Sequence, residues 1–79
     1  MAVHKIILFY AFAPVADPVA LKFWQSELAA RWDLTGRVIV SPHGINATLG
    51  GTIENLKRYV KSTKQFPGFG KMDVKWSDG

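Results

Sequence analysis

The sequence contains no cysteine among its 79 residues. This absence excludes disulfides, thiolate metal ligands and a cysteine nucleophile from the chain itself. The two histidines, His4 and His43, have no cluster of carboxylates beside them, so the sequence predicts neither a metal site nor a bound cofactor. No apolar run approaches the roughly 20 residues that a membrane-spanning helix needs. We therefore expect a cytoplasmic protein that makes no contact with membranes.

The composition is that of a folded domain with an excess of positive charge. Hydrophobic residues make up 48% of the chain and include three Trp, five Phe and two Tyr, which is enough for a packed core and argues against disorder. We expect residues 1–79 to form one domain, near the lower size at which a single core suffices. The net charge of +4 suits a weak contact with a polyanion such as nucleic acid.

Six segments have the patterns of regular secondary structure. The predicted strands are residues 4–13, 36–41, 44–51 and 71–76, and the predicted helices are residues 18–34 and 53–65. Asp17 and Thr52 are suited to cap the N-termini of the helices, and Gly36 is a plausible stop for the first. The resulting β-α-β-β-α-β order predicts an α+β, ferredoxin-like sandwich in which two helices cover one face of an antiparallel four-stranded sheet.

The first predicted strand is apolar on both faces, although one face of such a sheet carries no helix. Side chains alternate along a strand, so Ile7 and Phe9 share one face. Leu8, Tyr10 and Phe12 share the other. We expect the set on the open face to pack on something outside this chain. Which set that is stays open, and serine substitutions of Phe9 and Tyr10 should show one severe and one mild loss of stability.

The hairpin carries the most specific motif of the chain. Gly-Arg-Val-Ile-Val at residues 36–40 is followed by a turn and by Gly-Ile-Asn-Ala-Thr-Leu-Gly-Gly at residues 44–51. Phe-Tyr-Ala-Phe at 9–12, Ala-Asp-Pro at 16–18 and Lys-Met-Asp-Val-Lys-Trp-Ser at 71–77 complete a pattern that spans the chain. In this pattern the chain resembles the N-terminal, acylphosphatase-like domain of the rhodanese-related tRNA uridine hydroxylases.

The resemblance implies that this domain belongs to a larger enzyme. In that family a rhodanese domain with an active-site cysteine follows, and the enzyme uses oxygen to form 5-hydroxyuridine at the wobble position of tRNA. No residue here can supply that cysteine, so no catalytic residue is predicted and the isolated chain is expected to be inactive. We expect an accessory domain that contacts tRNA or the rhodanese domain of its parent protein. The alternative is a stand-alone ferredoxin-like module that self-associates without catalysis.

The turn motif is the first candidate site and consists of Gly44, Ile45, Asn46 and Thr48. In the related acylphosphatases an Asn on this hairpin helps to position a phosphate, whereas the alternative is that the Asn46 amide closes the turn. An acylphosphatase also needs a cradle of cationic and backbone donors after its first strand. Residues 13–16 contain neither Arg nor Gly, so hydrolase activity is expected only if backbone donors are sufficient there.

The second candidate site is basic and would contact an RNA backbone. It consists of Arg37, Lys57, Arg58, Lys61 and Lys64. The alternative is a solvated helix face on which Glu54 pairs with Lys57 or Arg58. An RNA-recognition motif has the same order of elements but stacks bases on aromatic residues of its two central strands. Residues 44–51 contain no aromatic residue, which argues against that mode of binding.

The third candidate site is a pair of phenylalanines in the loop between the second helix and the last strand. Phe66 and Phe69 stand in a Phe-Pro-Gly-Phe-Gly segment that must be irregular. Loops lie at the surface, so apolar side chains at their tips are candidates for an interface. The alternative is that both rings fold back and close the end of the core.

Overall fold

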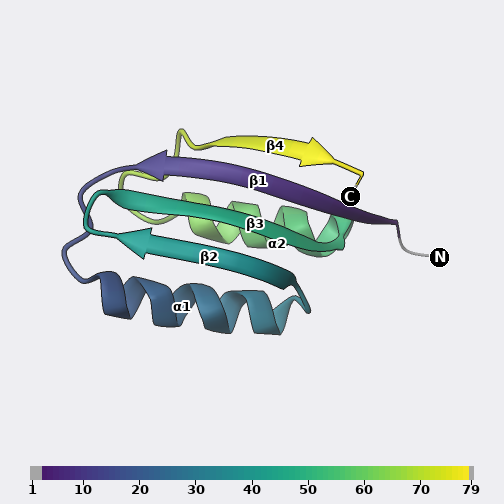
Figure 1. Cartoon of the computed structure of the whole chain (residues 1–79), viewed down its shortest axis with the longest axis horizontal. Helices are drawn as coiled ribbons and strands as arrows, with labels where there is room; N and C mark the ends of the chain where they lie inside the picture. The colour runs from purple at the N-terminus through teal and green to yellow at the C-terminus, as the bar shows by residue number, and fades with distance from the viewer. Residues whose placement is uncertain (1–2, 79) are drawn as a thin grey trace.

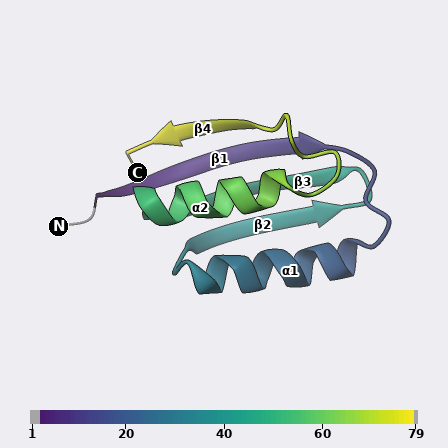
Figure 2. The same ribbon diagram turned by 180° about the vertical axis from the view of Figure 1, so that it is seen from behind.

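The fold is a two-layer sandwich in the computed structural model, which describes residues 3–78. Its elements are β1 (His4–Phe12), α1 (Pro18–Arg31), β2 (Thr35–Ser41), β3 (Gly44–Thr52), α2 (Ile53–Lys64) and β4 (Asp73–Ser77). The strands form one antiparallel sheet in the order β2-β3-β1-β4 (Figure 1). Seen from behind, α2 lies in front of the sheet and α1 lies along its β2 edge (Figure 2). The structure confirms the predicted order and the sandwich with helices on one face.

The alternation along β1 determines which side of the sheet is the core. Ile7 and Phe9 are fully buried beneath the helices. Leu8, Tyr10 and Phe12 face the other way, with 36%, 50% and 84% of their surface exposed. This answers the question that the sequence left open. The second apolar set lies on the face without helices, which we call the open face.

The C-terminus of α1 differs from the prediction. The helix ends at Arg31 rather than near residue 34. Asp33 adopts a left-handed conformation with φ of 56°. The N–H of Leu34 donates to the carbonyl of Ala29 at 2.9 Å, which closes a Schellman motif. Gly36 is therefore not the stop, and it lies inside β2 instead.

The N-termini of both helices follow the prediction. The Asp17 carboxylate accepts a hydrogen bond from the N–H of Ala20 at 3.0 Å. The Thr52 hydroxyl accepts one from the N–H of Asn55 at 3.2 Å. Each side chain satisfies one of the N–H groups that a helix start leaves without a partner inside the helix.

The last strand begins two residues later than predicted, at Asp73. Met72, just before it, is buried and Val74 is half-buried, as expected for inward residues. Trp76 pairs with Ile7 and so lies on the helix side of the sheet. It is nonetheless 42% exposed, because β4 is an edge strand with a neighbour on one side only.

A buried polar network joins the two helices, which the sequence patterns did not indicate. Gln25 of α1 and Tyr59 and Thr63 of α2 are all fully buried. The Gln25 amide donates to the Thr63 hydroxyl at 3.2 Å, and the Tyr59 hydroxyl donates to the Gln25 carbonyl oxygen. Each polar group in this part of the helix interface thus has a partner, as burial requires.

Removal of this network is expected to destabilise the domain. Gln25→Ala leaves two buried hydroxyls without their partner and opens a cavity, so we expect a loss of about 2–3 kcal/mol in the free energy of unfolding.

Burial raises the pKa of Tyr59 well above its ordinary value. Stability should therefore fall above about pH 10, where the unfolded tyrosine ionises and the folded one does not. Urea titrations of the parent and of Tyr59→Phe check this, since the variant should lose that part of the pH dependence.

Candidate functional site

The turn motif is divided between the two faces of the sheet. Gly44 and Ile45 are buried, with Ile45 in the core. Asn46 and Thr48 belong to the opposite set of alternating positions and lie on the open face. The motif is therefore partly a structural feature, and only Asn46 and Thr48 are placed to meet a ligand.

Asn46 is not a turn residue. The turn consists of Pro42 and His43, and the Ser41 hydroxyl accepts a hydrogen bond from the N–H of His43 at 3.2 Å. Asn46 lies two residues into β3, between Tyr10 of β1 and Ile39 of β2 in the register of the sheet. Its amide is free of the role of closing the turn and stands beside an aromatic ring.

The loop after β1 lacks the anion cradle that an acylphosphatase needs. The N–H of Ala13 donates to the carbonyl of His43 at 3.1 Å, and the N–H of Val15 donates to that of Pro42 at 2.9 Å. Pro14 has no N–H. These backbone donors hold the loop against the β2–β3 turn, so they are not available to gather phosphate oxygens. The N–H groups of Ala13 and Val15 thus give no support for hydrolase activity.

The basic candidates are also divided between the two faces. Lys57, Lys61 and Lys64 are exposed on α2. Arg58 is exposed beside them. Its guanidinium donates to the side-chain oxygen Oδ1 of Asn55 at 3.1 Å and lies 5.2 Å from the centre of the Trp32 ring. Arg37 lies on the open face instead, opposite Thr48 of β3. One RNA backbone cannot follow both groups without passing around the domain.

The predicted ion pair of Glu54 with Lys57 or Arg58 is wrong. Within residues 3–78 the only ion pair joins Lys5 to Asp78. Arg58 instead uses Asn55 and the ring of Trp32, neither of which removes its charge. The positive charge of α2 is thus not neutralised by a carboxylate of the same helix.

The two phenylalanines of the loop differ in burial. Phe69 is fully buried in the core, so it closes the end of the core and is not a surface residue. Phe66 is half-buried, with its ring centre 4.6 Å from that of Phe69 and 6.1 Å from that of Trp24. Phe66 and Trp24 line a groove of about 690 Å³ between the two helices. Of the pair, only Phe66 remains a candidate for an interface.

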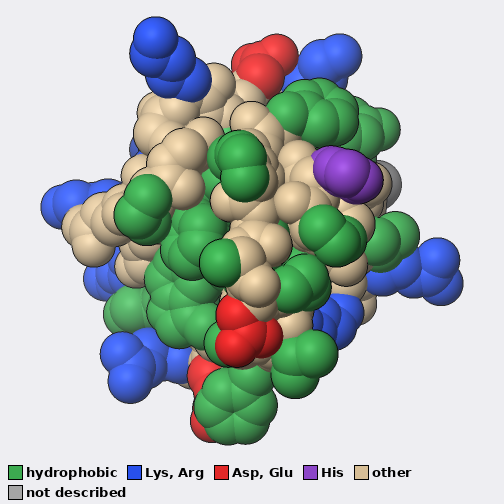
Figure 3. All heavy atoms as spheres, turned by 90° about the vertical axis from the view of Figure 1, so that its left-hand side faces the viewer, with side chains coloured by type: hydrophobic (Ala, Val, Ile, Leu, Met, Phe, Trp, Pro, Cys, Tyr) green, Lys and Arg blue, Asp and Glu red, His purple; other side chains and the backbone are tan. Residues whose placement is uncertain are grey.

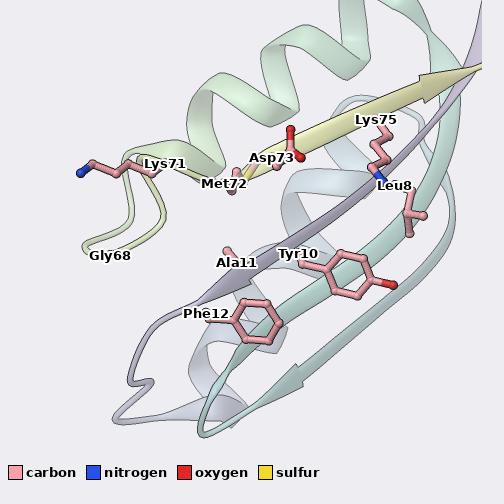
Figure 4. A pocket seen from close by; sticks show the side chains of 9 residues that line it. All are labelled: Leu8, Tyr10, Ala11, Phe12, Gly68, Lys71, Met72, Asp73 and Lys75. Atoms are coloured by element: carbon pink, nitrogen blue, oxygen red, sulfur yellow. The ribbon is translucent and has the colours of Figure 1, made fainter.

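The open face contains a group of residues that belongs to none of the three candidate sites, although the sequence indicated that its apolar members would meet a partner. The rings of Tyr10 and Phe12 are parallel, with an angle of 5° between their planes and 6.3 Å between their centres. A hollow of about 530 Å³ lies beside them and is also lined by Lys71, Asp73 and Lys75 (Figure 4). The signal in the sequence was the second apolar face of β1, which indicated a contact but not its chemistry.

Hydrophobic and basic side chains also occur together at one end of the molecule. This end carries the β1–α1 loop and the β2–β3 turn. Hydrophobic side chains are spread over this end, and Lys and Arg project mainly from its periphery (Figure 3). Phe12, the last residue of β1, is 84% exposed and brings the open face to this end. Apolar surface and positive charge thus lie close together here.

Among residues 3–78, no three side chains of His, Asp or Glu come together in a way that could hold a metal ion. Neither helix in this range has the length and apolar character needed to cross a membrane.

Three full-length relatives are similar to this chain along all of its 79 residues. Each is named tRNA uridine(34) hydroxylase. The relative from Rhodococcus erythropolis strain PR4 is 61% identical, that from Pseudarthrobacter chlorophenolicus strain A6 is 53% identical, and that from Corynebacterium glutamicum strain R is 51% identical. The chain covers 25–28% of their lengths, so it spans about a quarter of each relative.

The fold is also similar to part of a solved structure. The crystal structure of full-length HypF in its phosphate- and nucleotide-bound form matches the whole chain with a TM-score of 0.79 at 13% identity. The match covers 11% of the HypF chain and shows a shared fold. In sequence, residues 4–79 match the family model of the UPF0176 acylphosphatase-like domain. These matches confirm the resemblance drawn from the hairpin motif, and the chain belongs to the UPF0176 acylphosphatase-like domain family.

Proposed function

We propose that this chain is the N-terminal accessory domain of a cytoplasmic tRNA uridine hydroxylase. The observation that carries the proposal is the 61% identity over the whole chain to a protein of that name, of which the chain covers 28%. The chain has no cysteine, so the domain holds tRNA or the neighbouring rhodanese domain while the formation of 5-hydroxyuridine takes place elsewhere. Phe66 and the groove beside it are the surface that we assign to the contact with that domain.

The exposed side of α2 supports a contact with the phosphates of tRNA. Lys57, Lys61 and Lys64 repeat at intervals of four and three residues, so they follow one side of the helix. When lysines neutralise phosphates, the RNA releases the counterions condensed on it, so each such contact makes binding more sensitive to salt. The net charge of +4 adds a weak attraction over a longer distance.

Charge reversal on α2 is expected to weaken binding of tRNA. We expect Lys57→Glu, Lys61→Glu and Lys64→Glu each to reduce the affinity several-fold at low salt, and each to lower the salt dependence by about one phosphate contact. Fluorescence anisotropy with labelled tRNA at several salt concentrations measures both. Arg31→Glu changes the net charge equally on α1 and is the matched control. Equal losses in all four variants would mean that net charge, rather than the surface of α2, determines the affinity.

The exposed apolar residues of the open face favour one alternative function, a self-associating module without catalysis. A second copy would cover Leu8, Tyr10 and Phe12, which this chain leaves partly exposed. Sedimentation velocity over a range of concentrations tests this alternative, because it requires a dimer that grows with concentration. A monomer throughout would contradict it.

A further inference from the structure

We propose that the open face of the sheet binds unpaired nucleotides of RNA, with bases stacked on Tyr10 and Phe12. The inference rests on the proposed function, in which the partner is tRNA, and it assigns a second contact on the opposite side of the domain from α2. Four properties of the open face carry it. These are an exposed aromatic pair, a hollow beside that pair, polar groups within reach of base edges, and positive charge at both margins.

The aromatic pair provides the stacking surface. Tyr10 and Phe12 occupy successive outward positions on β1, and their parallel rings are 50% and 84% exposed. Together with Leu8 they form a contiguous apolar surface, and such surfaces mark interaction sites more often than single exposed residues do. Bases stack on such rings regardless of their identity, because every base has a π-face.

The hollow beside the rings has suitable polar groups. In the register of β4 with β1, Asp73 lies opposite Tyr10 and Lys75 lies opposite Leu8. The ammonium group of Lys75 can neutralise a phosphate, and the Asp73 carboxylate can accept a hydrogen bond from an exocyclic amino group of a base. Figure 4 shows the rings of Tyr10 and Phe12 projecting from β1, while the side chain of Lys71, in the loop before β4, points away from them.

A second hollow with polar groups lies on the other side of the rings, toward β3 and β2. It is smaller, at about 90 Å³, and is lined by Tyr10, Phe12, Ile39 and Asn46 among others. The Asn46 amide can both donate to and accept from a base edge. Arg37 lies two residues before Ile39 on β2, opposite Thr48, and can bind a phosphate. In this proposal, Asn46 of the turn motif contacts the edge of a stacked base.

The charge of the open face favours RNA over a second copy of the chain. Lys75 lies on β4 to one side of β1 and Arg37 lies on β2 beyond β3 to the other. Asp73 is the one carboxylate among the residues that line either hollow. A second copy would bring two net-positive faces together, whereas a phosphate chain is complementary to them. No aromatic residue lies on β3, so the stacking surface comes from a single strand and should hold about two bases.

A short oligouridylate of about eight nucleotides tests the proposal without any duplex. We expect Phe12→Ala and Tyr10→Ala each to weaken binding by roughly fivefold or more in fluorescence anisotropy, because each removes one stacked base. Tyr10→Phe keeps the ring and should retain the affinity. Phe23→Ala is the matched control, since Phe23 is 67% exposed on α1, away from the open face. Thermal unfolding verifies that each variant is folded at the temperature of the assay.

The outcomes separate this inference from the proposed function. None of these substitutions changes a charge, so unchanged binding of tRNA together with unchanged binding of oligouridylate overturns the open-face site alone. If the α2 lysine variants lose binding of tRNA and Phe12→Ala weakens binding of oligouridylate, both the α2 surface and the open-face site are supported. A dimer that Phe12→Ala dissociates, with no effect on RNA, assigns the open face to a second copy and overturns the proposal.

Discussion

Phe9→Ser is expected to unfold most of the protein at room temperature, whereas Tyr10→Ser leaves it folded. Phe9 is fully buried and its ring centre lies 6.0 Å from that of Tyr59, between the sheet and α2. Replacement of a buried Phe by Ala costs about 3–5 kcal/mol, and the serine hydroxyl adds the cost of burying a polar group. The single core of a domain of about 80 residues supplies only about 3–5 kcal/mol of net stability, so a loss of this size exceeds it.

Tyr10→Ser should cost no more than about 1 kcal/mol. Tyr10 is already 50% exposed, and substitutions at such positions usually change stability little. Urea denaturation followed by circular dichroism measures both free energies, and the two neighbouring residues serve as each other's control. Two equally severe losses would mean that both faces of β1 are filled within the chain, and the open face would no longer be a binding surface.

The pattern of β1 shows what a sequence can and cannot determine about this fold. Alternation with a period of two predicted that Ile7 and Phe9 share one face and that Tyr10 shares the other with Leu8. Which face meets the helices depends on the path of the chain through both crossovers, and both sets are equally apolar. The sheet therefore had to be seen before the open face could be assigned.

The end of α1 was mispredicted for a related reason. Glycine is the residue that most readily adopts the left-handed conformation at a helix end, so Gly36 was the stronger signal. Asp33 adopts that conformation here with φ of 56°, which Asp tolerates better than most other residues. Gly36 has a different task, because its φ of 136° places it where a Cβ would lie 2.1 Å from the carbonyl oxygen of Thr48.

The positions of the candidate residues in the fold could be predicted in part. Helical spacing correctly grouped Lys57, Lys61 and Lys64 on α2, because that spacing is local to one helix. Arg37 could not be placed by the same reasoning, since its face depends on the register of β2 with β3. The Gln25 network was missed because a single polar residue beside an apolar stripe normally lies at the surface. Its partners stand more than thirty positions along the chain.

Gly44→Ala is expected to be the most damaging conservative change in the turn motif. A Cβ at residue 44 would lie 2.1 Å from the carbonyl oxygen of Ala11, at a φ of +150° that residues other than glycine rarely adopt. The obstructing atom belongs to the backbone of β1, so relief requires β3 and β1 to move apart. We expect a loss of roughly 3 kcal/mol or more in the free energy of unfolding.

Gly50→Ala is the matched control, because it adds the same methyl group to the same strand. Its Cβ would meet the carbonyl oxygen of Lys5 at 3.6 Å, which is an ordinary contact, and we expect a change within about 1 kcal/mol. Urea denaturation compares the two variants. Equal and small effects would mean that the hairpin can move away from β1 at little cost. In that case Gly44 would not fix the position of Asn46 beside Tyr10. The presence of glycine at residue 44 would then not be explained by the close approach of β3 to β1.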